Sequence, residues 1–402
     1  MSPEKVVIIG GGAAGLMAAE VLCETHEVHI YEKGKALGRK FLVAGKGGFN
    51  LTNAIYGEEL YAKYQAPSFL QTALSGFDTK ACRQWLAKLG IPTYTGTSGR
   101  IFPEKGMKPI QVLQKITDRL HQQNVQFHFQ HEFVSFNENK QVVVQCRQQE
   151  ITLSADYIVF ALGGASWSVT GSDGTWTNAF NKTGIKTKPF QASNCGVNVA
   201  WPEEFKSAYA GSPLKNMQVS INDFSMKGEV LITEYGLEGN AIYPAVPEIR
   251  EALKGKQTVY IQLDVKPQNT TDQLLDKLKG KNVQPKNYKY DFKLNALQLA
   301  LLKLYTTKEN YLSPELFCRQ LKNIQIPITS LRPVEEAIST VGGIDTSEIN
   351  PDFSLKADPK IYIVGEMLDW DAPTGGFLLQ GCFATAYCAG KSIIAATKFT
   401  KL

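Results

Sequence analysis

The stretch Val6-Val7-Ile8-Ile9-Gly10-Gly11-Gly12-Ala13-Ala14-Gly15 decides the fold of this chain. Its four β-branched residues are typical of a strand buried in a parallel sheet, and an Ala/Leu-rich helical pattern follows to about Cys23. Between strand and helix lies Gly10-x-Gly12-x-x-Gly15, the dinucleotide-binding fingerprint. Its glycines permit a tight turn, close approach of backbone to a pyrophosphate, and close packing of strand on helix. We expect phosphates at the N-terminus of this helix, beside Ala14.

A second predicted strand, Val28–Tyr31, ends at an acidic residue, Glu32, which stands 22 residues after Gly10. A carboxylate at this distance binds the hydroxyls of the adenosine ribose, and it disfavours a ribose 2′-phosphate. The alternative is a tight turn in a sheet that binds no ligand. The combination of strand, glycine turn, helix and acid favours a dinucleotide site.

The segment that follows, residues 34–53, is rich in glycine, basic, and longer than a simple connector. A plain dehydrogenase has no need of it. FAD is held along its whole extended length, and such a segment brings amides, hydroxyls and Lys/Arg to it while glycines let the backbone lie close. The segment therefore predicts FAD; a flexible surface loop is the alternative.

Two later segments also contain a predicted strand that is followed by glycine. Asp156–Ala161 runs into Leu162-Gly163-Gly164, and Lys360–Val364 runs into Gly365-Glu366. Thr374-Gly375-Gly376 then opens an apolar helix that we expect to continue to about Ala396, and its first amides are suited to bind a ligand. The strands from both chain ends must flank one cofactor, so we expect both ends to build one domain.

The middle of the chain shows a different pattern. Short alternating segments between residues 190 and 265 predict an antiparallel sheet or small barrel. A capping box at Thr270–Gln273, with Gly280 as a stop, and leucines at positions 294, 297, 301 and 304 predict a small helical lobe. The expected fold is α/β with an α+β insert. We assign 1–189 and 332–402 to a Rossmann-like FAD domain, 190–266 and 321–331 to a β-rich substrate domain, and 267–320 to the helical lobe.

Five motifs carry a resemblance to a known family across essentially the whole chain. They are residues 38–53, Ser98–Pro103, Ala161–Ser166, Thr170–Gly174, and Val364–Asp369 with Gly375–Gln380. The chain resembles the bacterial flavoprotein family of NAD(P)/FAD-dependent oxidoreductases, which includes aminoacetone oxidases and bile-acid reductases. The resemblance implies non-covalent FAD, a two-part FAD domain and an inserted substrate region. Ala44–Asn50 and Gly236–Asn240 depart from the family's commoner pattern, so the chain looks like a divergent subgroup.

The motif residues and this resemblance together give a set of expected FAD contacts. The set is Gly10, Gly12, Ala14, Gly15, Glu32, Lys33, Arg39, Lys40, Gly45, Gly47, Gly48, Asn50, Thr52, Val134, Ala161, Gly163, Gly365, Glu366, Asp369, Gly375, Gly376 and Phe377. We also expect the helix that begins near Phe377 to point its positive end at the pyrimidine side of the flavin.

The mechanism depends on a feature that the sequence lacks. No second G-x-G-x-x-G follows a strand, so FAD is expected to be the only dinucleotide held in a Rossmann site. We expect hydride transfer between FAD and a small organic substrate. Either NAD(P)H docks transiently as donor, or an amine-type substrate reduces FAD and oxygen reoxidises it. The acid or base is not identified; Tyr235, Tyr243, Glu234, Glu238 and Arg100 are candidates.

Composition excludes several other classes. The net charge of +5 reads as a mild excess spread over the chain, which is too weak to indicate nucleic acid. The seven cysteines form no C-x-x-C pair and the five histidines have no ligand spacing, so no metal is expected. No apolar run approaches the roughly 18 residues of a membrane span, and no signal peptide is evident, so a cytoplasmic location is expected.

Two other functions remain open at this point. An FAD protein that acts on tRNA would use the basic excess together with Trp167, Trp176 and Trp201 as a nucleic-acid face. A flavin-binding regulator without turnover would hold FAD that no donor reduces. Cys382 and Cys388 are six residues apart on a predicted helix, so they and Cys195 are interpreted as small buried apolar residues.

Overall fold

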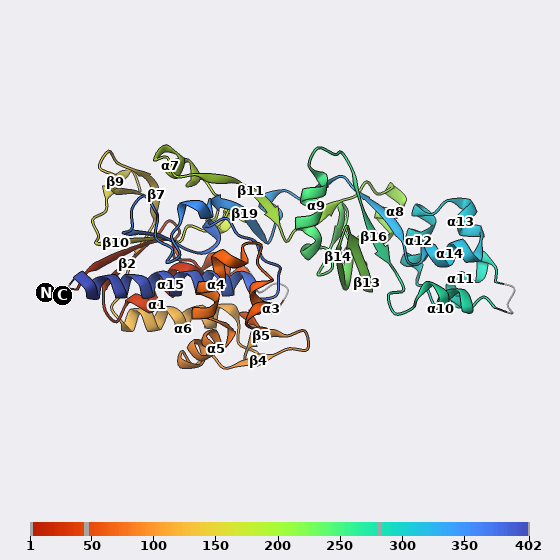
Figure 1. The fold of residues 1–402 in the computed structure, drawn as a ribbon, viewed down its shortest axis with the longest axis horizontal. Helices are drawn as coiled ribbons and strands as arrows, with labels where there is room; N and C mark the ends of the chain where they lie inside the picture. Colours follow the sequence, from red (N-terminus) through yellow and green to blue (C-terminus); the bar gives the residue numbers. More distant parts are fainter. Residues whose placement is uncertain (1–2, 44–47, 280–282, 401–402) are drawn as a thin grey trace. The chain divides into compact units, whose positions relative to one another are not determined.

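A computed structural model describes residues 3–43, 48–279 and 283–400, and it divides the chain into two compact units. Unit 1 comprises residues 1–191 and 339–402, and unit 2 comprises Ala192–Ile338. Both ends of the chain thus lie in unit 1 (Figure 1). The assignment of a separate helical lobe within the insert stays a prediction.

Unit 1 is built around a five-stranded parallel sheet with the order β20-β10-β1-β2-β6. Its strands are β1 (Lys5–Ile9), β2 (Glu27–Glu32), β6 (Gln126–Phe129), β10 (Tyr157–Phe160) and β20 (Ile361–Ile363). β1 pairs with β2 on one side and with β10 on the other, and β10 pairs with β20. This sheet confirms the predicted Rossmann-like fold, because strands from both chain ends share it.

The remaining strands of unit 1 form smaller sheets. β3 (Thr52–Asn53), β5 (Arg100–Pro103) and β4 (Thr93–Thr95) make one, and β7 (His131–Phe136), β8 (Val142–Cys146) and β9 (Gln149–Thr152) make another. β11 (Thr187–Ser193) pairs with β19 (Ser339–Ile344).

Eight helices of unit 1 surround these sheets in the described part of the chain. They are α1 (Ala13–Leu22), α2 (Arg39–Val43), α3 (Glu58–Tyr61), α4 (Pro67–Gly76), α5 (Thr79–Lys88), α6 (Pro109–Gln122), α7 (Thr177–Lys182) and α15 (Phe377–Thr400). Short 3-10 turns are η2 (Ser168–Thr170), η6 (Thr346–Glu348) and η7 (Gly365–Met367).

Helix α15 shows that the expectation about long apolar segments was wrong. Residues Phe377–Lys398 are long and apolar enough to cross a membrane by length and composition. Over half of that apolar window is buried inside the protein, and the helix packs against α1 and α4. The apolar composition of α15 is therefore explained by its place in the core of unit 1.

Unit 2 is organised around a seven-stranded sheet with the order β17-β16-β13-β14-β15-β12-β18. Its strands are β12 (Val197–Asn198), β13 (Pro213–Ile221), β14 (Phe224–Ile232), β15 (Gly236–Glu238), β16 (Val259–Asp264), β17 (Ile324–Ile328) and β18 (Ser330–Leu331). β17 and β18 stand at opposite ends of this order, yet only Thr329 separates them in the chain. The sheet must therefore curl until its ends meet, which gives the predicted barrel-like form.

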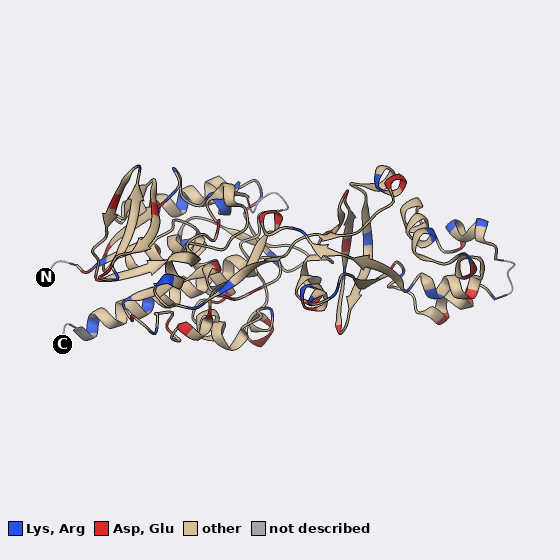
Figure 2. Cartoon of the chain, turned by 90° about the horizontal axis from the view of Figure 1, so that it is seen from above, with Lys and Arg blue, Asp and Glu red and all other residues tan. Residues whose placement is uncertain are grey.

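The helices of unit 2 pack on this sheet and on one another. They are α8 (Glu203–Tyr209), α9 (Val246–Leu253), α10 (Thr271–Asp276), α11 (Tyr288–Asp291), α12 (Ala296–Tyr305), α13 (Lys308–Leu312) and α14 (Pro314–Gln320), with η3 (Tyr243–Ala245), η4 (Pro285–Asn287) and η5 (Val334–Glu336). The capping box at Thr270 and Gln273 forms as predicted, whereas Gly280 lies outside the described residues. Charged residues of both signs lie on both units (Figure 2).

Candidate functional site

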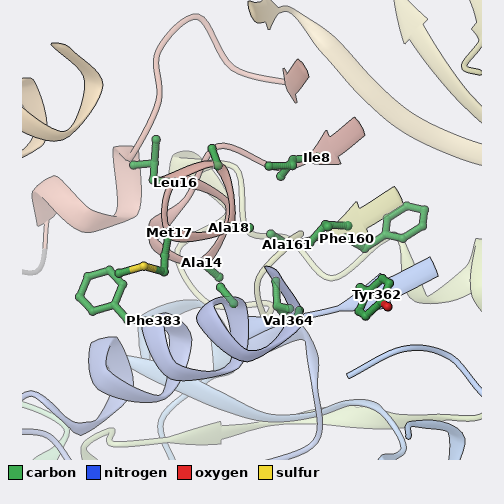
Figure 3. Close-up of a cluster of buried hydrophobic side chains, with 14 of the residues drawn as sticks. Ile8, Ala14, Leu16, Met17, Ala18, Phe160, Ala161, Tyr362, Val364 and Phe383 are labelled. Carbon is green, nitrogen blue, oxygen red and sulfur yellow. The ribbon is translucent and has the colours of Figure 1, made fainter. Parts of the chain in front are cut away.

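Four strands of the unit 1 sheet deliver polar or glycine-rich segments to one edge. β1, β2, β10 and β20 are parallel and in register, so the residues after their carboxyl ends meet there. Ligands of open α/β sheets bind in this position. A buried apolar cluster that includes Ile8, Met17, Phe160 and Phe383 joins the sheet, α1 and α15 behind it (Figure 3).

The glycine turn between β1 and α1 has the geometry that its sequence demands. Gly10 has φ of +106°, and a Cβ there would lie 2.4 Å from the Ala161 carbonyl oxygen. A Cβ on Gly15 would lie 1.9 Å from the Gly10 carbonyl oxygen, so strand and helix touch backbone to backbone. A Cβ on Gly12 would meet nothing within 4 Å. The N-terminus of α1 therefore faces open space, which fits a diphosphate.

Glu32 lies at the carboxyl end of β2, at the same edge of the sheet. Its Oε2 accepts a hydrogen bond of 2.9 Å from the Gly11 N–H, and its Oε1 accepts one of 2.7 Å from the Gly34 N–H. The two bonds fix the carboxylate at the end of β2. Each carboxylate oxygen has a further lone pair, so Glu32 can still accept bonds from ribose hydroxyls.

The three basic residues expected to contact FAD all have partners within unit 1. Lys33 Nζ lies 2.7 Å from Asp173 Oδ2; burial opposes ionisation of Asp173, but hydrogen bonds from Lys33 and Thr175 outweigh it and lower its pKa. Arg39 donates to the Val169 carbonyl oxygen at 2.5 Å. Lys40 Nζ donates to Ser166 Oγ and to Glu366 Oε2, both at 2.8 Å. All three therefore hold segments of unit 1 together.

Glu366 is the centre of a network that crosses the sheet edge. Besides Lys40, its carboxylate accepts a bond of 3.1 Å from the Thr340 N–H through Oε1. Thr340 Oγ1 in turn accepts from the Ala165 N–H at 3.2 Å. The segments that follow β10 and β20 are thus fixed to each other and to α2. Sequence reasoning missed Thr340; no pattern near Thr340 indicated that it would meet Glu366.

The start of α15 is tied to β3. Asn53 Nδ2 donates to the Gly375 carbonyl oxygen at 3.1 Å, and the buried Thr52 hydroxyl donates to Gln380 Oε1 at 2.7 Å. A Cβ on Gly376 would lie 2.4 Å from the Thr52 carbonyl group, which explains why only glycine fits there. The Phe377 carbonyl oxygen accepts from the Tyr64 hydroxyl at 2.7 Å. These contacts fix where the N-terminus of α15 lies.

The other expected contacts are placed as follows. The Asn50 amide lies against Gly48 and Gly376, and Ala161 and Gly163 follow β10, with Gly163 at φ of +74°. Gly365, at φ of +79°, packs against Ala14. Asp369 accepts from Lys188 at 2.6 Å and from the Gly342 N–H at 3.1 Å. Gly45 and Gly47 lie outside the described residues.

Val134 stands at an irregularity in the pairing of β7 with β8, where the register shifts between Phe133 and Ser135. A bulged residue is left out of the strand ladder, so its N–H and C=O groups are available to other partners. β7 also lies against β2. This location is compatible with the predicted contact to the cofactor.

The candidate acid–base residues separate between the two units. Arg100 belongs to unit 1, where β5 pairs it with Asn53 beside Gly375. In the described residues its guanidinium has no ion pair with a carboxylate. Tyr235, Tyr243, Glu234 and Glu238 belong to unit 2. Burial raises the pKa of Glu238, and burial together with Glu238 raises the pKa of Tyr243 to about 12.

The cysteine thiols do not form a redox pair in the described residues. None of the seven is in a disulfide bond; burial raises the pKa of Cys382 to about 12 and that of Cys388 to about 11. Thiols with such values stay protonated and are poor nucleophiles. No group of three or more metal-ligating side chains occurs between residues 3 and 400, outside the two undescribed gaps.

Comparisons with known proteins cover nearly the whole chain. Residues 4–392 match a family model described as the HI0933-like protein Rossmann domain. The 3-dehydro-bile acid delta(4,6)-reductase of Clostridium scindens is 26% identical over 96% of this chain and 98% of its own length. The ribosomal RNA dihydrouridine synthase of Escherichia coli is 24% identical over 97% of this chain and 98% of its own length. A solved structure of 3-ketosteroid-delta4-(5alpha)-dehydrogenase from Rhodococcus jostii is 14% identical and has a TM-score of 0.49. The match covers 98% of this chain and 97% of that chain.

Proposed function

The chain belongs to the HI0933-like family of FAD-binding Rossmann proteins and is an FAD-dependent oxidoreductase, and on this basis we propose that it reduces a conjugated carbon–carbon double bond in a small organic substrate. FAD supplies hydride transfer when it is bound. We propose that it is held without a covalent bond and is reduced by NAD(P)H that docks transiently.

The names of two relatives support the reaction class. One acts on the delta(4,6) double bonds of a 3-dehydro-bile acid, and the other makes dihydrouridine, which is uridine without its ring double bond. In both substrates a double bond is conjugated to a carbonyl group. Reduction of such a bond moves negative charge onto the carbonyl oxygen, and a positive group near that oxygen favours the reaction.

The proposed roles of the chain's own residues follow from the geometry of unit 1. The α1 N-terminus at Gly12 faces the open space that would hold the diphosphate, and Glu32 would bind the ribose. The α15 N-terminus, fixed by Asn53 and Thr52, would favour negative charge on the ring. Of these features, the open space at Gly12 is the strongest support for the proposal, since Gly10 and Gly15 of the same turn are packed against backbone.

A spectroscopic experiment tests the proposed function. The purified protein should be yellow and should release FAD on heat denaturation. Under anaerobic conditions NADH or NADPH should bleach the flavin, and an α,β-unsaturated ketone should restore its colour. Bleaching by small amines, with peroxide formed on aeration, would instead support an oxidase. Protein that binds FAD but is bleached by neither would contradict catalysis.

Arg100, which has no ion pair with a carboxylate in the described part of the chain, gives a prediction about turnover. We propose that its guanidinium faces the carbonyl oxygen of the substrate, because it lies beside Gly375 at the start of α15. Arg100→Met should slow reoxidation of the flavin by the enone roughly 10- to 100-fold, the size expected for a lost hydrogen bond to a charged group. Stopped-flow absorbance measures this rate.

Two further variants make the Arg100 test specific. Arg100→Lys should restore part of the rate, since it keeps the charge. Lys105→Met removes an exposed neighbouring cation that lies over the Tyr94 ring, and should leave the rate unchanged. Equal losses in Arg100→Met and Lys105→Met, or a loss of FAD content in Arg100→Met, would contradict the proposed role.

A further inference from the structure

The small sheet of β3, β5 and β4 in unit 1 carries a row of side chains on one face (Figure 1). Side chains alternate along a strand, so Arg100 and Phe102 of β5 share a face, and the two residues that alternate with them are buried. β5 pairs Arg100 with Asn53 of β3 and Phe102 with Tyr94 of β4. One face of the sheet therefore presents an amide, a guanidinium and two aromatic rings.

Phe102 and Tyr94 form the apolar part of this face. Their rings stack, with centroids 5.6 Å apart and an angle of 25° between the ring planes. Tyr94 is also covered by Lys105, whose Nζ lies 5.9 Å from the centroid of the ring. Phe102 is half-buried. An aromatic ring that reaches this face would therefore pack against Phe102, and Tyr94 would support Phe102 from the neighbouring strand.

The face adjoins two segments that we expect to contact FAD. A Cβ on Gly375, at the start of α15, would lie 3.6 Å from Arg100 Nε. A Cβ on Gly48 would lie 3.5 Å from Phe102 Cε1. The guanidinium and the aromatic ring that share the face thus both lie beside the expected cofactor segments, which is where a substrate of the flavin must bind.

We propose that Phe102, supported by Tyr94, selects α,β-unsaturated ketones that carry an aromatic ring on the β-carbon. Residues two positions apart on a strand are separated by about 6.6 Å. This spacing is close to the distance from an aromatic ring to the carbonyl oxygen across one conjugated double bond. The substrate's ring would therefore lie on Phe102 when its carbonyl oxygen faces Arg100. Stacked aromatic rings gain free energy beyond that of the buried area, which a saturated ring of the same size does not.

The inference rests on the proposed function and names a substrate class for it. The β-carbon gains a hydride, the two π electrons of the double bond move toward the α-carbon and the carbonyl oxygen, and the α-carbon gains a proton from water. The two electrons come from NAD(P)H through FAD. Phe102 and Tyr94 take no part in these transfers. They contact the ring in substrate and product alike, so the saturated product should also bind to them.

Binding of two saturated ketones, 4-phenyl-2-butanone and 4-cyclohexyl-2-butanone, tests the inference by calorimetric titration of the FAD-loaded protein. The phenyl ketone should bind roughly 2- to 12-fold more tightly, the size expected for one aromatic pair. Phe102→Leu should remove this preference, and Phe102→Tyr should keep it because the ring is retained. Tyr94→Leu should reduce the preference by a smaller factor. FAD content and the midpoint of thermal unfolding show whether each variant is folded.

Matched controls come from exposed rings outside this face. Phe129→Leu on β6 and Tyr290→Leu on α11 should leave the affinities of both ketones unchanged. Arg100→Met should weaken both ketones alike, because each has the same carbonyl group. Equal binding of the two ketones to the unmodified protein, or an unchanged preference in folded Phe102→Leu and Tyr94→Leu, overturns the inference. So does an equal loss of preference in Phe129→Leu or Tyr290→Leu.

Reoxidation of the reduced flavin by the matching enones separates this inference from the proposed function. With 4-phenyl-3-buten-2-one, Phe102→Leu should raise the concentration needed for half-maximal rate and leave the maximal rate unchanged. If neither the phenyl nor the cyclohexyl enone restores the colour of the flavin while the ketone preference holds, the proposed function fails and the role of Phe102 in binding the ring stands. If both enones restore the colour without a ketone preference, only this inference fails.

Discussion

Replacement of Gly12 by alanine is expected to weaken FAD binding about 1,000-fold, or about 4 kcal/mol, while the apoprotein keeps its stability. Gly12 has φ of −80° and ψ of −171°, which alanine adopts without strain, and its Cβ would meet no protein atom within 4 Å. The added methyl group would instead occupy the space that the diphosphate needs. Titration of apoprotein with FAD, followed by flavin fluorescence, and thermal unfolding of the apoprotein give the two quantities.

Gly15→Ala is the matched variant, because the same methyl group is added one helical turn away. Its Cβ would lie 1.9 Å from the Gly10 carbonyl oxygen, so β1 and α1 must move apart. We expect Gly15→Ala to lower the apoprotein's midpoint of unfolding as well as FAD binding. Unchanged FAD affinity in Gly12→Ala would show that the cofactor does not lie at the start of α1.

Replacement of Glu32 by alanine should weaken FAD binding about 100-fold and also destabilise the apoprotein. The Gly11 and Gly34 N–H groups would lose the carboxylate that accepts from both. An unsatisfied, partly buried N–H costs about 1–3 kcal/mol. Because water replaces part of the contact, we expect the free energy of unfolding of the apoprotein to fall by about 2 kcal/mol. FAD titration and urea unfolding measure the two effects.

Glu32→Gln tests which of these effects comes from the charge. Glutamine keeps one acceptor oxygen but cannot accept through both ends of the group. Glu32→Gln should lower the free energy of unfolding about half as much as Glu32→Ala does, and it should bind FAD more weakly than the unmodified protein. If Glu32→Ala bound FAD normally but unfolded more easily, Glu32 would be a purely structural residue, and the ribose contact would be excluded.

The sequence was sufficient to predict the parallel sheet and which residues follow the ends of its strands. β-branched strands followed by glycines give an unambiguous local signal, and parallel pairing then places Gly10, Glu32 and Gly365 together. A local pattern also predicted the capped start of α10. In each of these elements, the residues that determine the structure are neighbours in the chain.

Long-range pairs could not be predicted in this way. Lys40 and Glu366 are 326 positions apart, and no periodicity links them. Each was expected to contact FAD, whereas the structure joins them to each other through a charge-assisted hydrogen bond. The charge of unit 2 is a different case, because it was present in the sequence. The net charge of +5 over all 402 residues concealed a basic segment of 57 residues, 266–322, which alone has a net charge of +6.

The pairing of β11 with β19 has a consequence for how this protein could change over time. The chain leaves unit 1 along β11 and returns along β19, so exit and entry are adjacent strands of one ribbon. A tight turn could join the two strands directly. Unit 2 (Ala192–Ile338) could therefore be replaced by another domain without a change in the path of the chain through unit 1. Selection could thus replace unit 2 while the parallel sheet of unit 1 stays intact.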